Sequence, residues 1–145
     1  MVKPAKQSVA VAIRNQSGQL LTVRRADDDR DLPGLWGLPA VSLRAGETPE
    51  QAAIRAGRDK LGVSIEICGL IGTQSAMLEA GQIQLSEYTG RVRSGTPAVP
   101  QPDRSVSQYV DLCYTDDLTG LFNAARRGSL CSRIYLDSIG VQWRA

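Results

Sequence analysis

The sequence contains no histidine, and this absence removes several kinds of active site. Ser-His-Asp triads, His-ligated zinc sites and histidine general bases all need an imidazole. The three cysteines, Cys68, Cys113 and Cys131, are far apart and form no C-x-x-C pair. We therefore expect the reduced thiols of a cytoplasmic protein rather than a disulfide framework. The chemistry that remains to the chain is that of carboxylates, lysines, arginines and hydroxyls.

Long apolar runs and a strong charge of either sign are also missing. No run approaches the roughly 18 apolar residues of a transmembrane helix, and Val9–Ile13 is too short for a signal peptide. The net charge is only +2, so composition predicts neither a nucleic acid polymer nor a membrane as partner. The 145 residues, 42% of them hydrophobic, suit one domain over residues 1–145, as a monomer or a homodimer.

The most informative stretch reads LWGLPAVSLRAGETPEQAAIRAGRDKLGV. Thr48 is a good N-cap, and Pro49 suits the first helical position because proline has no N–H to lose there. Gln51 can complete a capping box, and Gly62 readily adopts the left-handed conformation that ends a helix. These signals predict a helix over Pro49–Leu61.

At about 100° per residue the predicted helix has two faces. The inward face is expected to hold Ala53, Ile54, Gly57 and Leu61, and the outward face Ala52, Arg55, Ala56, Asp59 and Lys60. A charged strip of this kind is common on solvated helices, so it does not by itself indicate a site.

The order of residues around this helix resembles the Nudix box of the Nudix (MutT-like) pyrophosphohydrolases. The box spans Val41–Val63 here. Glu47, Arg55, Gly62 and Val63 match the signature, Asp59 replaces the first glutamate of its Glu-Glu pair, and the lead-in LWGLP is similar to that of the family.

The sequence departs from the signature at five positions. Val41 replaces the opening glycine. Ala56 and Lys60 replace two of the three helix glutamates, and Gly57 replaces an aliphatic residue. Ala40 stands where the residue before the box is commonly glycine. An alanine at position 57 would be stabilising unless a neighbour fills that space.

The resemblance implies an α/β fold, a Nudix-type α/β/α sandwich with a mixed β-sheet. It implies cleavage of a pyrophosphate bond in a small nucleoside diphosphate derivative with Mg²⁺ or Mn²⁺ as cofactor. Glu47 and Asp59 would be the surviving metal ligands and catalytic carboxylates, and Arg55 would orient Glu47 by a bidentate pair. Because the family often draws one more carboxylate from outside the box, Glu87 is the candidate for a third ligand.

Cations near the box are candidates for binding substrate phosphates. Arg24 and Arg25 end a predicted strand that leads toward the box, and Lys60 lies on the helix where the family places its metal. Each of the three could equally be a solvated charge. The acidic segment Ala26–Asp31 lacks the spacing of a calcium loop and is expected to be a surface loop.

The remaining elements follow from local patterns. Residues 8–25 are expected to form a hairpin, and 75–81 a turn-rich link. Strands are predicted at 64–72, 82–93 and 106–114, a proline-containing loop at 94–105, and helices from a cap at Asp116 or Asp117 to Gly128 and at 129–139.

Two functions remain open from the sequence. The chain is either a metal-dependent Nudix hydrolase or a Nudix-like domain that binds nucleoside diphosphate derivatives with weak or absent turnover. The missing helix carboxylates favour the second. The family resemblance favours the first, and we therefore predict a Nudix hydrolase, with the binding domain as the alternative. A domain that only binds other proteins has no feature of its own in this sequence.

Overall fold

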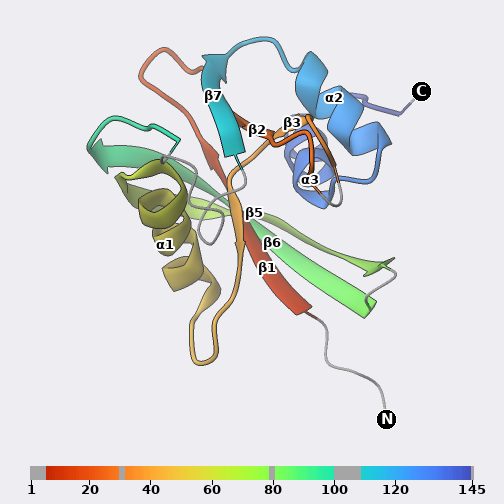
Figure 1. Cartoon of the computed structure of the whole chain (residues 1–145), viewed down its shortest axis with the longest axis horizontal. Helices are drawn as coiled ribbons and strands as arrows, with labels where there is room; N and C mark the ends of the chain where they lie inside the picture. The colour runs from red at the N-terminus through yellow and green to blue at the C-terminus, as the bar shows by residue number, and fades with distance from the viewer. Residues whose placement is uncertain (1–5, 30–31, 79–80, 100–108, 145) are drawn as a thin grey trace.

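A computed structural model describes residues 6–29, 32–78, 81–99 and 109–144. It contains helices on both sides of a twisted sheet, with a second, smaller sheet at one end (Figure 1). Within these residues no helix is long and apolar enough to cross a membrane. The elements in chain order are β1 (Lys6–Ile13), β2 (Leu20–Arg25), β3 (Trp36–Gly37), β4 (Ala40–Ser42), α1 (Pro49–Leu61), β5 (Ser64–Leu78), β6 (Gly81–Ser94), β7 (Tyr109–Thr115), α2 (Thr119–Arg126) and α3 (Leu130–Ser138).

The larger sheet is mixed and has the strand order β4-β1-β6-β5. Strand β1 lies at its centre, antiparallel to β4 and parallel to β6, and both of its faces are covered. This position explains the unbroken apolar run Val9–Ile13, because a strand buried on both faces does not alternate with polar residues. The smaller sheet has the order β3-β2-β7.

The predicted hairpin over residues 8–25 is wrong. Strands β1 and β2 belong to different sheets, and a single bridge between Arg14 and Leu20 joins their ends. The predicted link over 75–81 is also wrong, because β5 continues to Leu78 and pairs with β6 along its length. Both errors arise because local turn residues cannot reveal which strands pair over long distances.

Helix α1 has the predicted bounds and the predicted ends. The Thr48 side chain accepts from the Gln51 N–H, the Gln51 side chain accepts in return, and Gly62 ends the helix at φ 70°. The predicted inward face is only partly correct. Ala53, Gly57 and Leu61 are buried, but Ile54 is 43% exposed. Three residues of the predicted outward face are buried instead: Ala52, Arg55 and Ala56.

Helix α1 and the pair α2 and α3 cover opposite faces of the mixed sheet (Figure 1). The core beneath α1 includes Val9, Val11 and Ile13, and the core beneath α2 and α3 includes Ala10 and Ala12. Helix α3 lies within the predicted segment 129–139 and follows the N-cap Ser129. The predicted cap of α2 at Asp116 or Asp117 is wrong, because the N-cap is Leu118 and the Asp117 side chain accepts from the Thr119 N–H. Residues 30–31 of the acidic segment, 100–105 of the proline-containing loop and 106–108 of the last predicted strand lie outside the described residues.

Gly57→Ala is expected to lower the stability of the protein. A Cβ at position 57 would lie 2.9 Å from Cγ2 and 3.1 Å from Cγ1 of Ile65, closer than ordinary contact. Overpacking of this kind costs roughly 1–3 kcal/mol, which exceeds or cancels the ~1 kcal/mol that alanine contributes to a helix. Thermal unfolding of the single variant and of the same change in an Ile65→Ala background measures the clash. The change should become stabilising once Ile65 is shortened, and a rise in the midpoint of the single variant would contradict this packing.

Candidate active site

Arg55 fixes the loop before α1 by a bidentate ion pair with Glu47. Its Nε lies 2.9 Å from Oε2 and its Nη2 3.0 Å from Oε1 of that carboxylate, and Nη2 also donates to the Ser42 carbonyl at 2.7 Å. The N–H of Arg44 donates to Oε1 as well. The hydrogen bonds from Arg55, followed by that from Arg44, lower the pKa of Glu47 to about 2. Glu47 is therefore ionised, and both of its oxygens are engaged.

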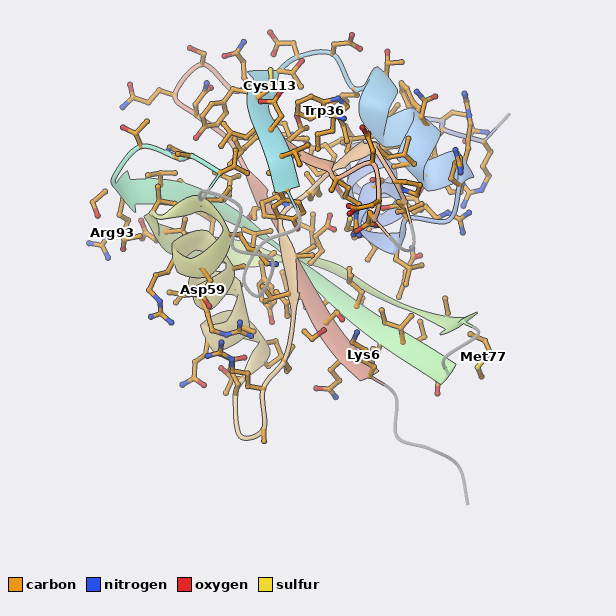
Figure 2. The ribbon with its side chains drawn as sticks, in the orientation of Figure 1. Lys6, Trp36, Asp59, Met77, Arg93 and Cys113 are labelled. Carbon is orange, nitrogen blue, oxygen red and sulfur yellow. The ribbon has the colours of Figure 1, made fainter. Side chains whose placement is uncertain are left out.

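Asp59 lies among three arginines. Its oxygens are 3.4 Å from Nε of Arg58, 3.5 Å from Nη1 of Arg55 and 3.7 Å from Nη2 of Arg44. Figure 2 shows this residue on α1, well away from Trp36 and Cys113. Three guanidinium groups within ion-pair distance make the surroundings of this carboxylate cationic.

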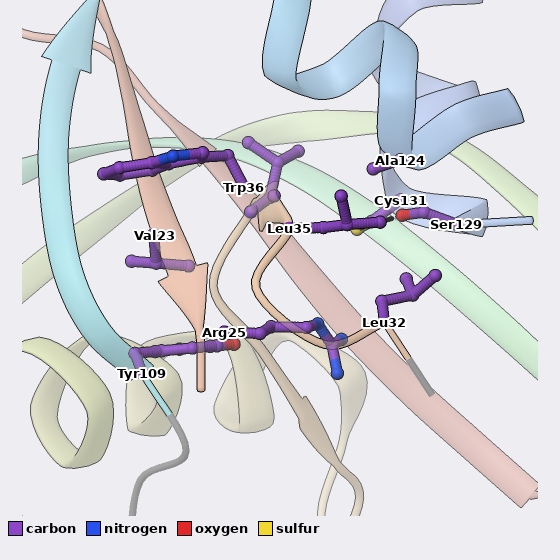
Figure 3. Close-up of a pocket in the computed structure, with 11 residues that line it drawn as sticks. Val23, Arg25, Leu32, Leu35, Trp36, Tyr109, Ala124, Ser129 and Cys131 are labelled. Carbon is purple, nitrogen blue, oxygen red and sulfur yellow. Dashed lines mark hydrogen bonds between the residues drawn. The ribbon is translucent and has the colours of Figure 1, made fainter. Parts of the chain in front are cut away.

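Lys60 follows Asp59 on α1, and Arg25 at the end of β2 is close enough to act on the charge of Lys60. The Nζ atom of Lys60 is 5.4 Å from the centre of the Tyr109 ring, a cation–π contact. Burial, and then the nearby charge of Arg25, lower the pKa of Lys60. Arg25 is 3.2 Å from the buried carboxylate of Asp29, and beside Tyr109 it lines a small cavity (Figure 3). Arg24 pairs instead with the exposed Asp27 at 3.3 Å.

Glu87 is on the opposite face of the mixed sheet from α1. It is paired in register with Ala10 of β1 and Gly72 of β5, and shares its face with Leu85, in the core beneath α2 and α3. Its side chain is fully buried, and neither carboxylate oxygen has a hydrogen-bond partner in the described part of the chain. Burial raises the pKa of Glu87 to about 9. The structure thus brings Glu47 and Asp59 to one site and does not bring Glu87 to it.

The residues at this site do not fit a divalent cation. Mg²⁺ and Mn²⁺ prefer several carboxylate or carbonyl oxygens, and the two carboxylates present, Glu47 and Asp59, are bound to arginines. The buried side chain of Ala56 offers no ligand, and Lys60 repels a cation. Across the described ranges, no group of three or more His, Cys, Asp or Glu side chains could hold a metal ion.

Sequence comparison gives the family. The family model described as "NUDIX domain" matches residues 4–130. The chain belongs to the Nudix family. An uncharacterised Nudix hydrolase of Listeria monocytogenes is 30% identical over 132 residues, which make up 80% of this chain and 78% of that protein.

Comparison with solved structures supports the predicted Nudix fold. The MutT Nudix hydrolase of Burkholderia pseudomallei has a TM-score of 0.74 at 22% identity, covering 94% of this chain and 99% of that one. The Nudix domain of Shewanella oneidensis NrtR, crystallised with ADP ribose, has a TM-score of 0.63 at 18% identity, covering 94% and 87%. The chain is thus a mixed α/β protein with a Nudix fold.

Sequence reasoning missed three residues of this site: Arg44, Arg58 and Tyr109. The two arginines flank the box carboxylates at positions that the signature leaves free, so no pattern singles them out. Tyr109 begins β7 and reaches Lys60 only through the tertiary fold. Its hydroxyl accepts from the Ala40 N–H at 3.0 Å, which fixes the ring beside the box loop.

Proposed function

We propose that this Nudix protein binds a nucleoside diphosphate derivative at the site around α1 and cleaves its pyrophosphate bond slowly. The observation that carries the proposal is that the helix carboxylates of the signature are either replaced or bound to arginines. Ala56 and Lys60 replace two glutamates of the signature, and Asp59 is shared among three arginines. Carboxylates that hold divalent cations and activate water supply most of the catalysis in such a reaction. With them removed or engaged, the cationic side chains favour binding of the diphosphate over its hydrolysis.

The likeness to the NrtR domain supports the ligand class. That domain has the same fold and was crystallised with ADP ribose, in which a diphosphate links two sugars. In the present chain, Lys60 is a cation at the site with no carboxylate within ion-pair distance among the described residues. Arg25 is paired with Asp29 and lies beside the same Tyr109 ring that Lys60 contacts. We therefore assign them to the phosphates of the ligand. Arg24 forms an ion pair with the exposed Asp27, and we assign it a weaker contact with the phosphates.

A metal-dependent pyrophosphohydrolase is the second candidate. The observation in its favour is that Glu47 and Asp59 both remain, each within 4 Å of the same guanidinium of Arg55. A divalent cation would have to draw Asp59 away from its arginines before this site could act.

A ligand screen separates the two candidates. Binding of ADP ribose and other nucleoside diphosphate derivatives is measured by calorimetry, and products are followed by chromatography, each in Mg²⁺, in Mn²⁺ and in EDTA. We expect binding of at least one compound, with turnover well below the roughly 1 s⁻¹ at the low end of ordinary enzymes. Turnover in the ordinary range would favour the second candidate, and no binding under any condition would contradict both.

A further inference from the structure

Lys60 lies on the buried stripe of α1 rather than on its solvated face. Ala52, Ala56 and Lys60 follow one another at intervals of four residues, which places them on one side of the helix. Both alanines are fully buried, and Lys60 is half-buried at the end of the stripe, against the ring of Tyr109. Lysine is rarely buried unless its charge is paired.

The ammonium of Lys60 has no carboxylate within ion-pair distance among residues 6–29, 32–78, 81–99 and 109–144. Asp29, which the fold buries, is engaged by Arg25 at 3.2 Å. Asp59 is engaged by three arginines and is not within 4 Å of Nζ. Three charges act on Lys60 without contact: Arg25 and Arg55 repel it, and Asp59 attracts it from beyond ion-pair distance.

The cluster of charged side chains around Asp59 and Lys60 also has a net positive charge. Among the residues that the structure describes, it contains five cations and three carboxylates: Arg25, Arg44, Arg55, Arg58 and Lys60 against Asp29, Glu47 and Asp59. A diphosphate that links two groups carries one negative charge on each phosphate. Such a ligand would neutralise the excess, whereas a divalent cation would increase it.

We propose that Lys60, together with Arg25, binds the diphosphate oxygens directly and takes the place of the divalent cation in ligand binding. The proposal rests on the proposed function and adds that the site is an anion site that needs no metal. Arg25 presents a planar fork of donors held in place by Asp29, and Lys60 presents a compact charge held against Tyr109.

The test measures affinity by calorimetry on the full chain, with α,β-methylene-ADP and inorganic pyrophosphate as probes, in EDTA and in Mg²⁺. The natural protein should bind the nucleotide probe in EDTA with an affinity within about threefold of that in Mg²⁺. Lys60→Met should bind the nucleotide probe at least about tenfold more weakly, both in EDTA and in Mg²⁺. Lys60→Arg should retain part of the affinity. Arg127→Ala is the charge-matched control, because it removes an exposed cation at the end of α2, and it should bind as the natural protein does.

Each outcome has a separate meaning. Binding of the nucleotide probe only with Mg²⁺ would overturn this inference and leave the proposed function standing. Binding of pyrophosphate alone in EDTA, lost in Lys60→Met, would support the anion site and contradict the nucleoside ligand. Unchanged affinity in Lys60→Met overturns the role of Lys60. If that variant does not fold, the salt dependence of the natural protein decides, because direct charge contacts predict clearly weaker binding in EDTA as ionic strength rises.

Discussion

Replacing Glu87 with glutamine is expected to raise the thermal midpoint of the protein at neutral pH, and to raise it further as the pH increases. The carboxyl is fully buried between β1, β5 and α3, and no described side chain or backbone group hydrogen-bonds its oxygens. An ionised carboxylate in such a place loses its hydration without compensation. Glutamine has nearly the same shape and is never charged, so it removes this penalty and leaves the packing in place.

The sign and range of the effect follow from the pKa of Glu87. Its ordinary value is 4.5, and burial raises it to about 9 in the folded protein. Between these values the folded state keeps a proton that the unfolded chain has released, so the free energy of unfolding falls as pH rises. The favourable contribution is complete below pH 4.5 and is lost as the pH rises toward 9. At about 1.4 kcal/mol per pKa unit, the loss is ~3 kcal/mol at neutral pH, or several degrees in the midpoint.

Glu50→Gln is the matched control for this measurement. Glu50 is exposed in the first turn of α1, where the helix dipole favours a negative charge. Its replacement should change the midpoint slightly and in the opposite direction. Midpoints of the three proteins are compared by calorimetry from acid to alkaline pH. A Glu87→Gln difference that stays flat with pH, or a variant less stable at alkaline pH, would mean that the carboxylate has a partner that it needs.

Local signals in the sequence were enough to predict both ends of α1. The cap Thr48, the proline after it and the terminal Gly62 act within a few residues of each other, so their effect does not depend on the rest of the fold. The Ser129 cap of α3 was not predicted, although its side chain accepts from the Ser132 N–H in the same local way.

Features that depend on distant partners were not predicted from local patterns. The predicted buried face of α1 differs from the observed one, because the hydrophobic Ile54 was expected to be buried. The structure instead packs small residues, Ala52, Ala53 and Ala56, against the sheet, and this close approach leaves room for Ile65 over Gly57. A one-dimensional pattern cannot show which neighbour fills a helix face.

The family signature indicated some residues of the candidate site but not the charges around them. The signature gave Glu47, Arg55 and Asp59, and the structure brings all three together. The arginines at 44 and 58, which surround Asp59, occupy positions that the signature leaves free. The proposed metal role of Glu87 rested on the family's use of one more carboxylate from outside the box, and strand register places that side chain on the other face of the sheet.

The double variant Ala56→Glu/Lys60→Glu is expected to convert the anion site into a metal site. It restores the three helix carboxylates of the Nudix signature, with Asp59 between the two new ones along the chain. Position 56 is fully buried, so a carboxylate there is costly unless a cation compensates it. In EDTA the variant should therefore unfold at a lower temperature than the natural protein. Added Mg²⁺ should reverse part of this loss, by about 2.7 kcal/mol at a concentration 100 times the dissociation constant.

The natural protein should show no comparable rise of its midpoint with Mg²⁺, because its remaining carboxylates are bound to arginines. Ala56→Gln/Lys60→Gln is the matched control, since it adds side chains of the same size without charge and should not respond to Mg²⁺. If the double variant does not fold, Lys60→Glu alone tests the same point with Ala56 in place.

Product release from a nucleoside diphosphate derivative is measured alongside, and should be faster in the charged variant than in the natural protein. A natural protein that Mg²⁺ stabilises as strongly as the variant would show that Arg44, Arg55 and Arg58 do not keep Asp59 from a metal, and the electrostatic account of this site would then be wrong.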